Sequence, residues 1–262
     1  ITMNRSTSLI VLAFIGLLFT SCRKEITLDL DHEDHKVVIE AIIDQGPGPH
    51  TVRLSRSLAF EAPNTFPLIS NASVTLSDDL GHSEQLTETA PGSYTTTTLQ
   101  GDQLRTYRLN ATVDGTTYSA QCSMPVAVTM DTLLIDSFPS FGSYTRVLVP
   151  GYVDPAGIAN HYRFTVFVNG KKQEGINLEN DRFTDGNMVL QPLFLNDVEL
   201  NSGDLVQVTM ECITPEVYDY FFSMAQNVGN AATPADPLSN ISGGALGYFS
   251  VRTTSSRTVV LP

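Results

Sequence analysis

The sequence predicts an all-β protein with two tandem β-sandwich domains of the immunoglobulin, transthyretin or fibronectin-III-like type and one short helix in the second. From residue 36 onward, short runs rich in Val, Ile, Thr and Tyr alternate with Gly, Pro, Asn and Asp at spacings near ten residues, a pattern typical of strands and turns. Asp114-Gly115 and Asn169-Gly170 each follow a strand-like run. Such pairs favour two-residue hairpin turns because both positions tolerate positive φ.

The first domain is predicted to cover residues 36–125. Segments 46–49 and 61–68 contain prolines, which offer no amide hydrogen to a strand ladder, so we predict turns or exposed loops there. Alternation predicts that one set of side chains points inward: Val74, Leu76, Tyr107, Leu109, Ala111 and Val113. The predicted strands are 37–43, 51–57, 73–77, 83–88, 93–98, 104–113 and 116–124.

The second domain is predicted to cover residues 126–262 and to contain a helix at about 215–228. Pro215 suits the first helical turn, Glu216 faces the positive end of the helix dipole, and Gly229 ends the helix. The predicted strands are 132–138, 145–153, 161–168, 188–195, 205–212, 245–252 and 257–261.

One face of this helix is apolar, and two interpretations of it stay open. The face either packs on the second sandwich or forms a docking surface for a partner. Its residues are Val217, Tyr220, Phe221 and Met224.

The N-terminal segment has the order of a secretory signal peptide, predicted over residues 1–21. A polar start with Arg5 leads into an apolar stretch at 9–19, which is too short to span a bilayer. Thr20 and Ser21 then precede Cys22, as in the box where bacterial lipoproteins are acylated. We therefore expect a covalent lipid on Cys22; the alternative is an ordinary signal peptide followed by a chance cysteine.

Residues 22–35 are predicted to form a flexible tether, because charged groups dominate after the lipidated cysteine. The whole chain has a net charge of −13, and removal of the signal peptide makes it one unit more negative. Phosphate backbones repel such a surface, so nucleic acid is excluded as a partner. Cys122 and Cys212 remain after Cys22; they either form a disulfide or stay as two separate buried thiols.

The sequence predicts neither a metal site nor a cofactor. The segment 32–35 supplies histidines and acids, but a tether has no supporting residues to hold them around an ion. Asp78-Asp79 and the segment 181–185 lack the spacing of an EF-hand loop. We interpret both as turns with solvated carboxylates.

We do not expect an enzyme. The chain has no Gly-x-Ser-x-Gly elbow, and no nucleophile stands at a motif spacing from a histidine. His50, His82 and His161 are the candidate bases. A hydrolase would need one of them within hydrogen-bond reach of a nucleophile and a carboxylate.

The chain resembles an uncharacterised family of Bacteroidota outer-membrane lipoproteins, the domain of unknown function 4249. The resemblance covers almost the whole chain after the signal peptide, and its motifs are mostly turns and strand starts. The motifs that carry it are Lys24-Glu25-Ile26-Thr27-Leu28-Asp29 after the acylation site, Val37-Val38-Ile39-Glu40-Ala41, Gly48-Pro49-His50-Thr51-Val52-Arg53-Leu54-Ser55, Asn71-Ala72-Ser73-Val74-Thr75-Leu76-Ser77-Asp78, Pro91-Gly92-Ser93-Tyr94 and residues 240–249.

Members of that family are typically encoded beside TonB-dependent receptors, which implies an accessory subunit of a nutrient importer docked on a SusC-like β-barrel. The loop 58–70 or the helix 215–228 would supply the contacts. The alternative is an independent surface protein that binds a peptide or glycan. The resemblance implies an outer-membrane location at the cell surface; Arg23 and Lys24 stand where surface-exported relatives often have acidic residues, so the periplasmic face stays the alternative.

Overall fold

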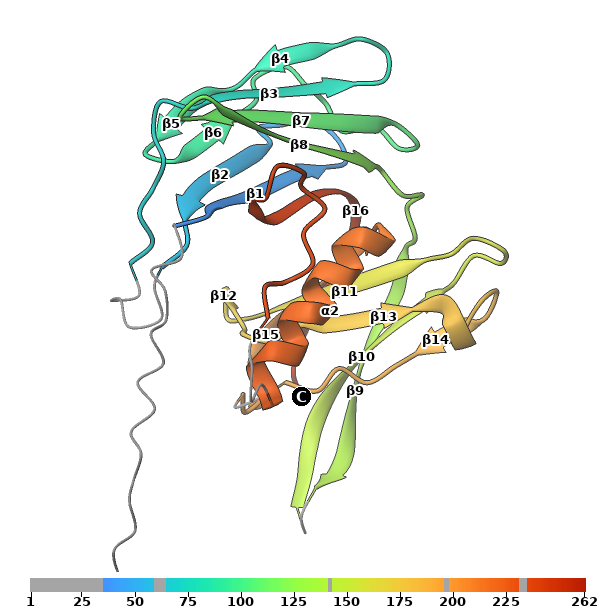
Figure 1. Cartoon of the computed structure of the whole chain (residues 1–262). Helices are drawn as coiled ribbons and strands as arrows, with labels where there is room; N and C mark the ends of the chain where they lie inside the picture. The colour runs from blue at the N-terminus through green and yellow to red at the C-terminus, as the bar shows by residue number, and fades with distance from the viewer. Residues whose placement is uncertain (1–34, 59–64, 141–142, 196–197, 231–234) are drawn as a thin grey trace, which may run out of the picture. The chain divides into compact units, whose positions relative to one another are not determined.

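The computed structural model describes residues 35–58, 65–140, 143–195, 198–230 and 235–262 (Figure 1). The predicted signal peptide, Cys22 and the tether up to residue 34 lie outside the described residues. The described chain is mostly β, with several sheets and one α-helix, which confirms the all-β prediction at this level. Within the described part, no helix has the length and apolar character needed to span a bilayer.

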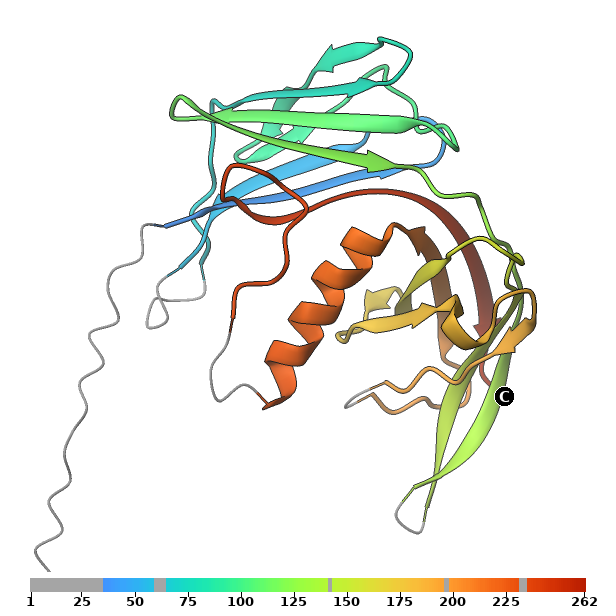
Figure 2. The same cartoon turned by 45° about the vertical axis from the view of Figure 1, so that its right-hand side comes forward.

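The largest sheet has nine strands in the order β12-β11-β15-β16-β1-β2-β6-β5, with β13 paired to β11 (Figures 1 and 2). Val, Ile, Leu and aromatic residues alternate with polar ones along most of these strands, so one face of each can be buried. The strands are β1 (Val37–Asp44), β2 (Thr51–Arg56), β5 (Thr87–Ala90), β6 (Ser93–Thr95), β11 (His161–Val168), β12 (Lys171–Lys172), β13 (Asn177–Asn180), β15 (Leu205–Ile213) and β16 (Leu246–Val260).

Two smaller sheets have the orders β4-β3-β7-β8 and β14-β10-β9. A short 3-10 helix, η2 (Asp181–Phe183), lies between β13 and β14, and the α-helix α2 (Pro215–Asn230) follows β15. The strands are β3 (Ser73–Asp78), β4 (Ser83–Gln85), β7 (Thr106–Val113), β8 (Thr116–Ser123), β9 (Met130–Ser140), β10 (Ser143–Val153) and β14 (Met188–Leu190).

Both predicted hairpin turns are confirmed. Asp114 and Gly115 have φ of 49° and 81° between β7 and β8, and Asn169 and Gly170 have φ of 51° and 78° between β11 and β12. Positive φ at both positions matches the twist of the flanking strands.

The strand β16 joins the two halves of the chain. Residues 246–252 pair in parallel with β1, and residues 253–260 pair antiparallel with β15. The sequence predicted two separate strands, 245–252 and 257–261, and this prediction is wrong because the polar segment between them stays extended. Hydroxyl groups of this segment form hydrogen bonds with neighbouring strands. The Ser256 and Thr209 hydroxyls are 2.8 Å apart, and the Ser255 Oγ accepts the Met130 amide hydrogen at 2.9 Å.

Two clusters of buried apolar side chains form the core of the described part of the chain. The first combines β1 and β2 with β3, β7 and β8, and it contains all six side chains predicted to point inward from β3 and β7. The second combines β9, β10 and β14 with β11 and β15. Residues of β16 up to Val251 belong to the first cluster, and Val259 packs against the second. A division near residue 125 stays a prediction, and β16 contributes to both sides of it.

The helix α2 is where the sequence predicted it, but its apolar face is covered by the chain's own strands. Val217, Tyr220 and Phe221 are buried in the first cluster, and Met224 packs against it. Phe221 also lies under the Arg163 guanidinium of β11, 4.1 Å from the ring centre. Of the two interpretations left open by the sequence, internal packing is the one found, but the four residues pack in the first cluster and not on the second domain as that interpretation expected. Burying them removes a large apolar area from water.

A buried charge network lies where β16 passes from one partner strand to the other. The Glu211 carboxylate on β15 is nearly inaccessible and contacts the guanidinium groups of Arg163 at 3.1 Å and Arg252 at 2.8 Å. The Thr165 hydroxyl donates to its other oxygen at 2.9 Å. Arg252 also contacts Asp44 of β1 at 2.6 Å. The network therefore connects β11, β15, β16 and β1.

Cys122 and Cys212 are free thiols, each buried. Burial raises the pKa of Cys122 to about 11 and also raises the pKa of Cys212, so both stay protonated near neutral pH. The Cys122 Sγ lies 3.8 Å from the Thr214 hydroxyl. Of the two interpretations left open by the sequence, separate buried thiols is the one found.

Glu84 on β4 accepts hydrogen bonds from the backbone amides of Thr97, Thr98 and Leu99 at 2.5, 3.1 and 2.7 Å. Burial alone would raise the pKa of Glu84, but these amides and the Thr97 hydroxyl lower it to about 2. Because the pKa in the folded state lies below its unfolded value, this carboxylate stabilises the fold above about pH 4.5, and the contribution disappears as pH falls toward 2.

We expect Glu84→Gln to lower the free energy of unfolding by about 1–2 kcal/mol at pH 7, since charge-assisted bonds at a partly exposed site are weakened by solvent. Urea denaturation at pH 7 and at pH 3 measures this difference, which should shrink at the lower pH. Glu174→Gln, at an exposed position, is the control. An equal difference at both pH values would contradict the assigned role of the carboxylate.

Candidate functional site

The outer face of the β14-β10-β9 sheet exposes large apolar side chains. Cross-strand pairing fixes which side chains share this face: Leu134 lies opposite Val149, Leu190 opposite Gly151, and Met188 opposite Val153. The alternate residues point into the second cluster. Six apolar residues on the outer face are each about half exposed: Leu134, Phe138, Val153, Met188, Leu190 and Phe194.

These six residues, which we call the apolar sheet face, are held by close packing. The rings of Phe138 and Phe194 meet edge to face, 5.2 Å between centres. Gly151 lies in the middle of this face, where the side chains of Thr132 and Leu190 occupy the space above it. A Cβ at this position would lie 2.9 Å or less from both of them. Figures 1 and 2 show the β9–β10 hairpin extending away from the other strands.

Large apolar side chains gathered in this way on an exposed sheet face are a feature of interaction sites. This face is not evident from the sequence, because β9 and β10 carry apolar side chains on both faces and their alternation does not indicate which face is buried. A signal was present in the consecutive apolar residues Leu133-Leu134-Ile135 and Val147-Leu148-Val149, which indicate strands covered on both sides.

The loop 58–70, predicted as a docking segment, is described only in part. Residues 59–64 lie outside the described residues. Beyond them Phe66 and Leu68 are exposed by 50% and 60%, and Leu68 forms a bridge with Ser55 of β2. Phe66 and Leu68 are among the residues that line a hollow of about 460 Å³ beside β1 and β2.

The structure places the three histidines in separate surroundings. His50 is buried, and burial lowers its pKa; His82 bonds the Asp78 carboxylate at 2.7 Å; His161 lies beside the Tyr218 ring, 5.0 Å between centres. Across the described ranges, no hydrogen bond joins any of these rings to a serine, threonine or cysteine side chain. The geometry that a hydrolase would require is not formed by these residues.

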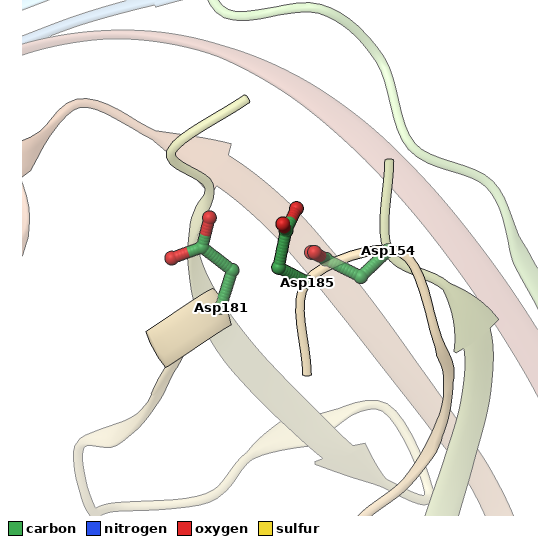
Figure 3. A group of neighbouring side chains, drawn as sticks. All are labelled: Asp154, Asp181 and Asp185. Atoms are coloured by element: carbon green, nitrogen blue, oxygen red, sulfur yellow. The ribbon is translucent and has the colours of Figure 1, made fainter. Parts of the chain in front are cut away.

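Three aspartates come together at the end of β10: Asp154, directly after the strand, and Asp181 and Asp185 around η2 (Figure 3). One carboxylate oxygen from each lies within 4.8 Å of the others. Asp154 is fully buried; burial and the charges of Asp181 and Asp185 raise its pKa, against the hydrogen bond from Tyr162. The sequence interpretation of 181–185 as solvated turn residues did not include Asp154.

Backbone bonds connect the two segments that carry these aspartates. The Asn160 amide donates to the Asp181 carboxylate at 2.9 Å and the Gly157 amide to that of Asp185 at 2.7 Å. The Asp154 amide donates to the Asn187 carbonyl at 3.0 Å. The sequence alone does not predict that Asp154 lies beside Asp181 and Asp185, because the pairing of β10 with β14 brings these segments together.

Comparison with curated proteins gave no match. The comparison with protein families matched residues 23–258 to one family, described as a domain of unknown function, DUF4249. This match spans nearly all the chain, including the first core cluster, the second cluster except Leu261, the apolar sheet face and the three aspartates. The chain therefore belongs to the DUF4249 family.

Proposed function

We propose that this protein is a lipid-anchored, non-enzymatic accessory subunit of a TonB-dependent nutrient importer in the outer membrane of a Bacteroidota bacterium. The single observation that carries the docking part is the apolar sheet face, six half-exposed apolar side chains on one sheet. The anchor rests on the small-residue pair before Cys22, and the identity of the partner rests on the family resemblance.

The apolar sheet face has the composition of the centre of an interface. Aromatic residues and methionine are enriched at the centre of interfaces, and the face contains Phe138, Phe194 and Met188. The negative net charge of the chain disfavours direct contact with acidic head groups, which supports a protein partner for this face.

We also propose that the two core clusters are those of two β-sandwiches of the immunoglobulin or transthyretin type. Each cluster takes side chains from two sheets, which supports this architecture. The shared strand β16 would then be a covalent and hydrogen-bonded link between the two sandwiches.

The test of the docking surface is a mild-detergent pull-down of the tagged full chain from its native membrane, read by mass spectrometry. We expect recovery of a TonB-dependent receptor at near-equal amounts. The double substitution Leu134→Ser and Phe138→Ser should lower this recovery at least about tenfold, since loss of about 1.4 kcal/mol of binding energy has that effect. Both side chains are about half exposed, so the fold should tolerate the change.

The matched control is Leu80→Ser with Phe183→Ser, an exposed Leu and Phe outside the apolar sheet face; receptor recovery should be unchanged. Cys22→Ala should release the protein from the membrane. If the unsubstituted protein comes down alone from intact outer membrane, stable docking is refuted.

The alternative function is independent capture of a peptide or glycan at the cell surface. The observation that favours it is the hollow of about 460 Å³ beside β1 and β2, lined by polar groups of Arg53, Ser55 and Ser93 and by the apolar side chains of Phe66 and Leu68. Ligand affinity of the purified protein without a receptor, lost in Arg53→Ala, would favour this function over docking.

A further inference from the structure

We propose that Asp154, Asp181 and Asp185 bind one calcium ion at the end of β10. One oxygen of each carboxylate lies within 4.8 Å of the others (Figure 3). Two oxygens on opposite sides of a calcium ion are separated by about 4.6–5.2 Å, twice the Ca–O distance. The three aspartates can therefore share one ion.

The buried carboxylate of Asp154 points to a ligand independently of this clustering. The residue has 0% relative exposure. One of its oxygens accepts the Tyr162 hydroxyl. The other, Oδ2, has no hydrogen bond of good geometry, although the Gly186 amide lies near the carboxylate and lowers its pKa. A buried oxygen without a partner is strongly unfavourable, especially on a carboxylate. A cation coordinated there would satisfy it.

Backbone donors hold the other two carboxylates in place. The amides of Asn160 and Gly157 donate to Asp181 and Asp185, and the Asp181 amide donates back to the Asn160 carbonyl at 3.2 Å. Groups that orient metal ligands in this way raise affinity, because less order has to be imposed on binding. In Figure 3 Asp154 projects from the opposite segment toward Asp185.

The donor set selects the kind of ion. Three carboxylates without a cysteine or histidine favour a hard cation over zinc or copper. Calcium accepts irregular oxygen sets of six to eight ligands completed by water and backbone carbonyls, whereas magnesium demands a near-ideal octahedron. With three protein carboxylates, we expect a dissociation constant of about 10⁻⁴–10⁻³ M, the range of extracellular calcium modules.

Isothermal titration of the metal-depleted full chain with CaCl₂ tests the proposal. We expect one site per chain and a rise of the melting temperature in calcium relative to EDTA. Asp154→Asn and Asp185→Asn should each weaken calcium binding at least tenfold and remove that rise. Asp185 is exposed, so Asp185→Asn decides the result if Asp154→Asn fails to fold.

Asp219→Asn, an exposed aspartate on α2, is the matched control and should bind calcium like the original protein. Absence of binding up to 10 mM free calcium, substituted proteins that bind as tightly as the original, or binding of Mg²⁺ without Ca²⁺ would each overturn the proposal. None of these outcomes depends on a receptor, so the test is separate from that of the docking function.

Discussion

Glu211→Ala is expected to lower the free energy of unfolding by about 3–5 kcal/mol, the cost of leaving buried charges without their partner. The guanidinium groups of Arg163 and Arg252 both contact the Glu211 carboxylate. Arg252 keeps Asp44 as a second partner, whereas among the described residues Arg163 keeps its contact with the Phe221 ring and no other ion pair. Most of the loss should therefore arise at Arg163.

Urea denaturation followed by circular dichroism measures this effect. Glu211→Gln retains the shape and one acceptor, and should lose less than the alanine variant. Asp114→Asn removes the charge of the exposed pair with Arg56 and keeps a residue that tolerates the positive φ of this turn, so it should cost less than about 1 kcal/mol. If Glu211→Ala cost no more than Asp114→Asn, the buried network would not stabilise the junction of the strands.

Gly247→Ala is expected to destabilise the fold by about 3 kcal/mol or more. Gly247 has a φ of +96° and lies directly opposite Ile39 in the parallel pairing of β16 with β1. A Cβ there would overlap the Ile39 carbonyl oxygen, and this backbone atom cannot move without opening the sheet. Strain from the positive φ adds about 1 kcal/mol or more.

Gly244→Ala separates the two contributions. Gly244 has a similar φ of +83°, but an added Cβ would meet no atom within 4 Å. It should therefore cost only the conformational strain, about 1 kcal/mol. Thermal or urea unfolding of both variants measures the difference, and equal losses would show that the close approach to β1 is unimportant.

Local patterns in the sequence predicted the elements better than their assembly. The turns at Asp114 and Asn169, the helix from Pro215 and the inward residues of β7 depend on neighbouring residues, and all are confirmed. The continuity of β16 was missed because Thr253 to Ser256 have the composition of a loop, and only pairing with β15 keeps them extended. The partner of the apolar helix face likewise depends on contacts distant in sequence.

The candidate sites illustrate the same limit. Asp154 is at least 27 residues away from Asp181 and Asp185 along the chain. Its carboxylate is buried where it accepts the hydrogen bond of the Tyr162 hydroxyl. The apolar sheet face could not be assigned from β9 and β10 alone, because both faces of these strands carry apolar residues. Exposure is a property of the assembled sheets, so neither site has a local motif.

The shared strand β16 has a consequence for the order of folding of a chain that emerges N-terminus first. Such a chain presents β1 and β15 before residues 246–260 arrive, and each then has one edge with open backbone donors and acceptors. Open edges of this kind recruit strands from other molecules. Neither edge can be closed early, and the arrival of the last segment closes both at once.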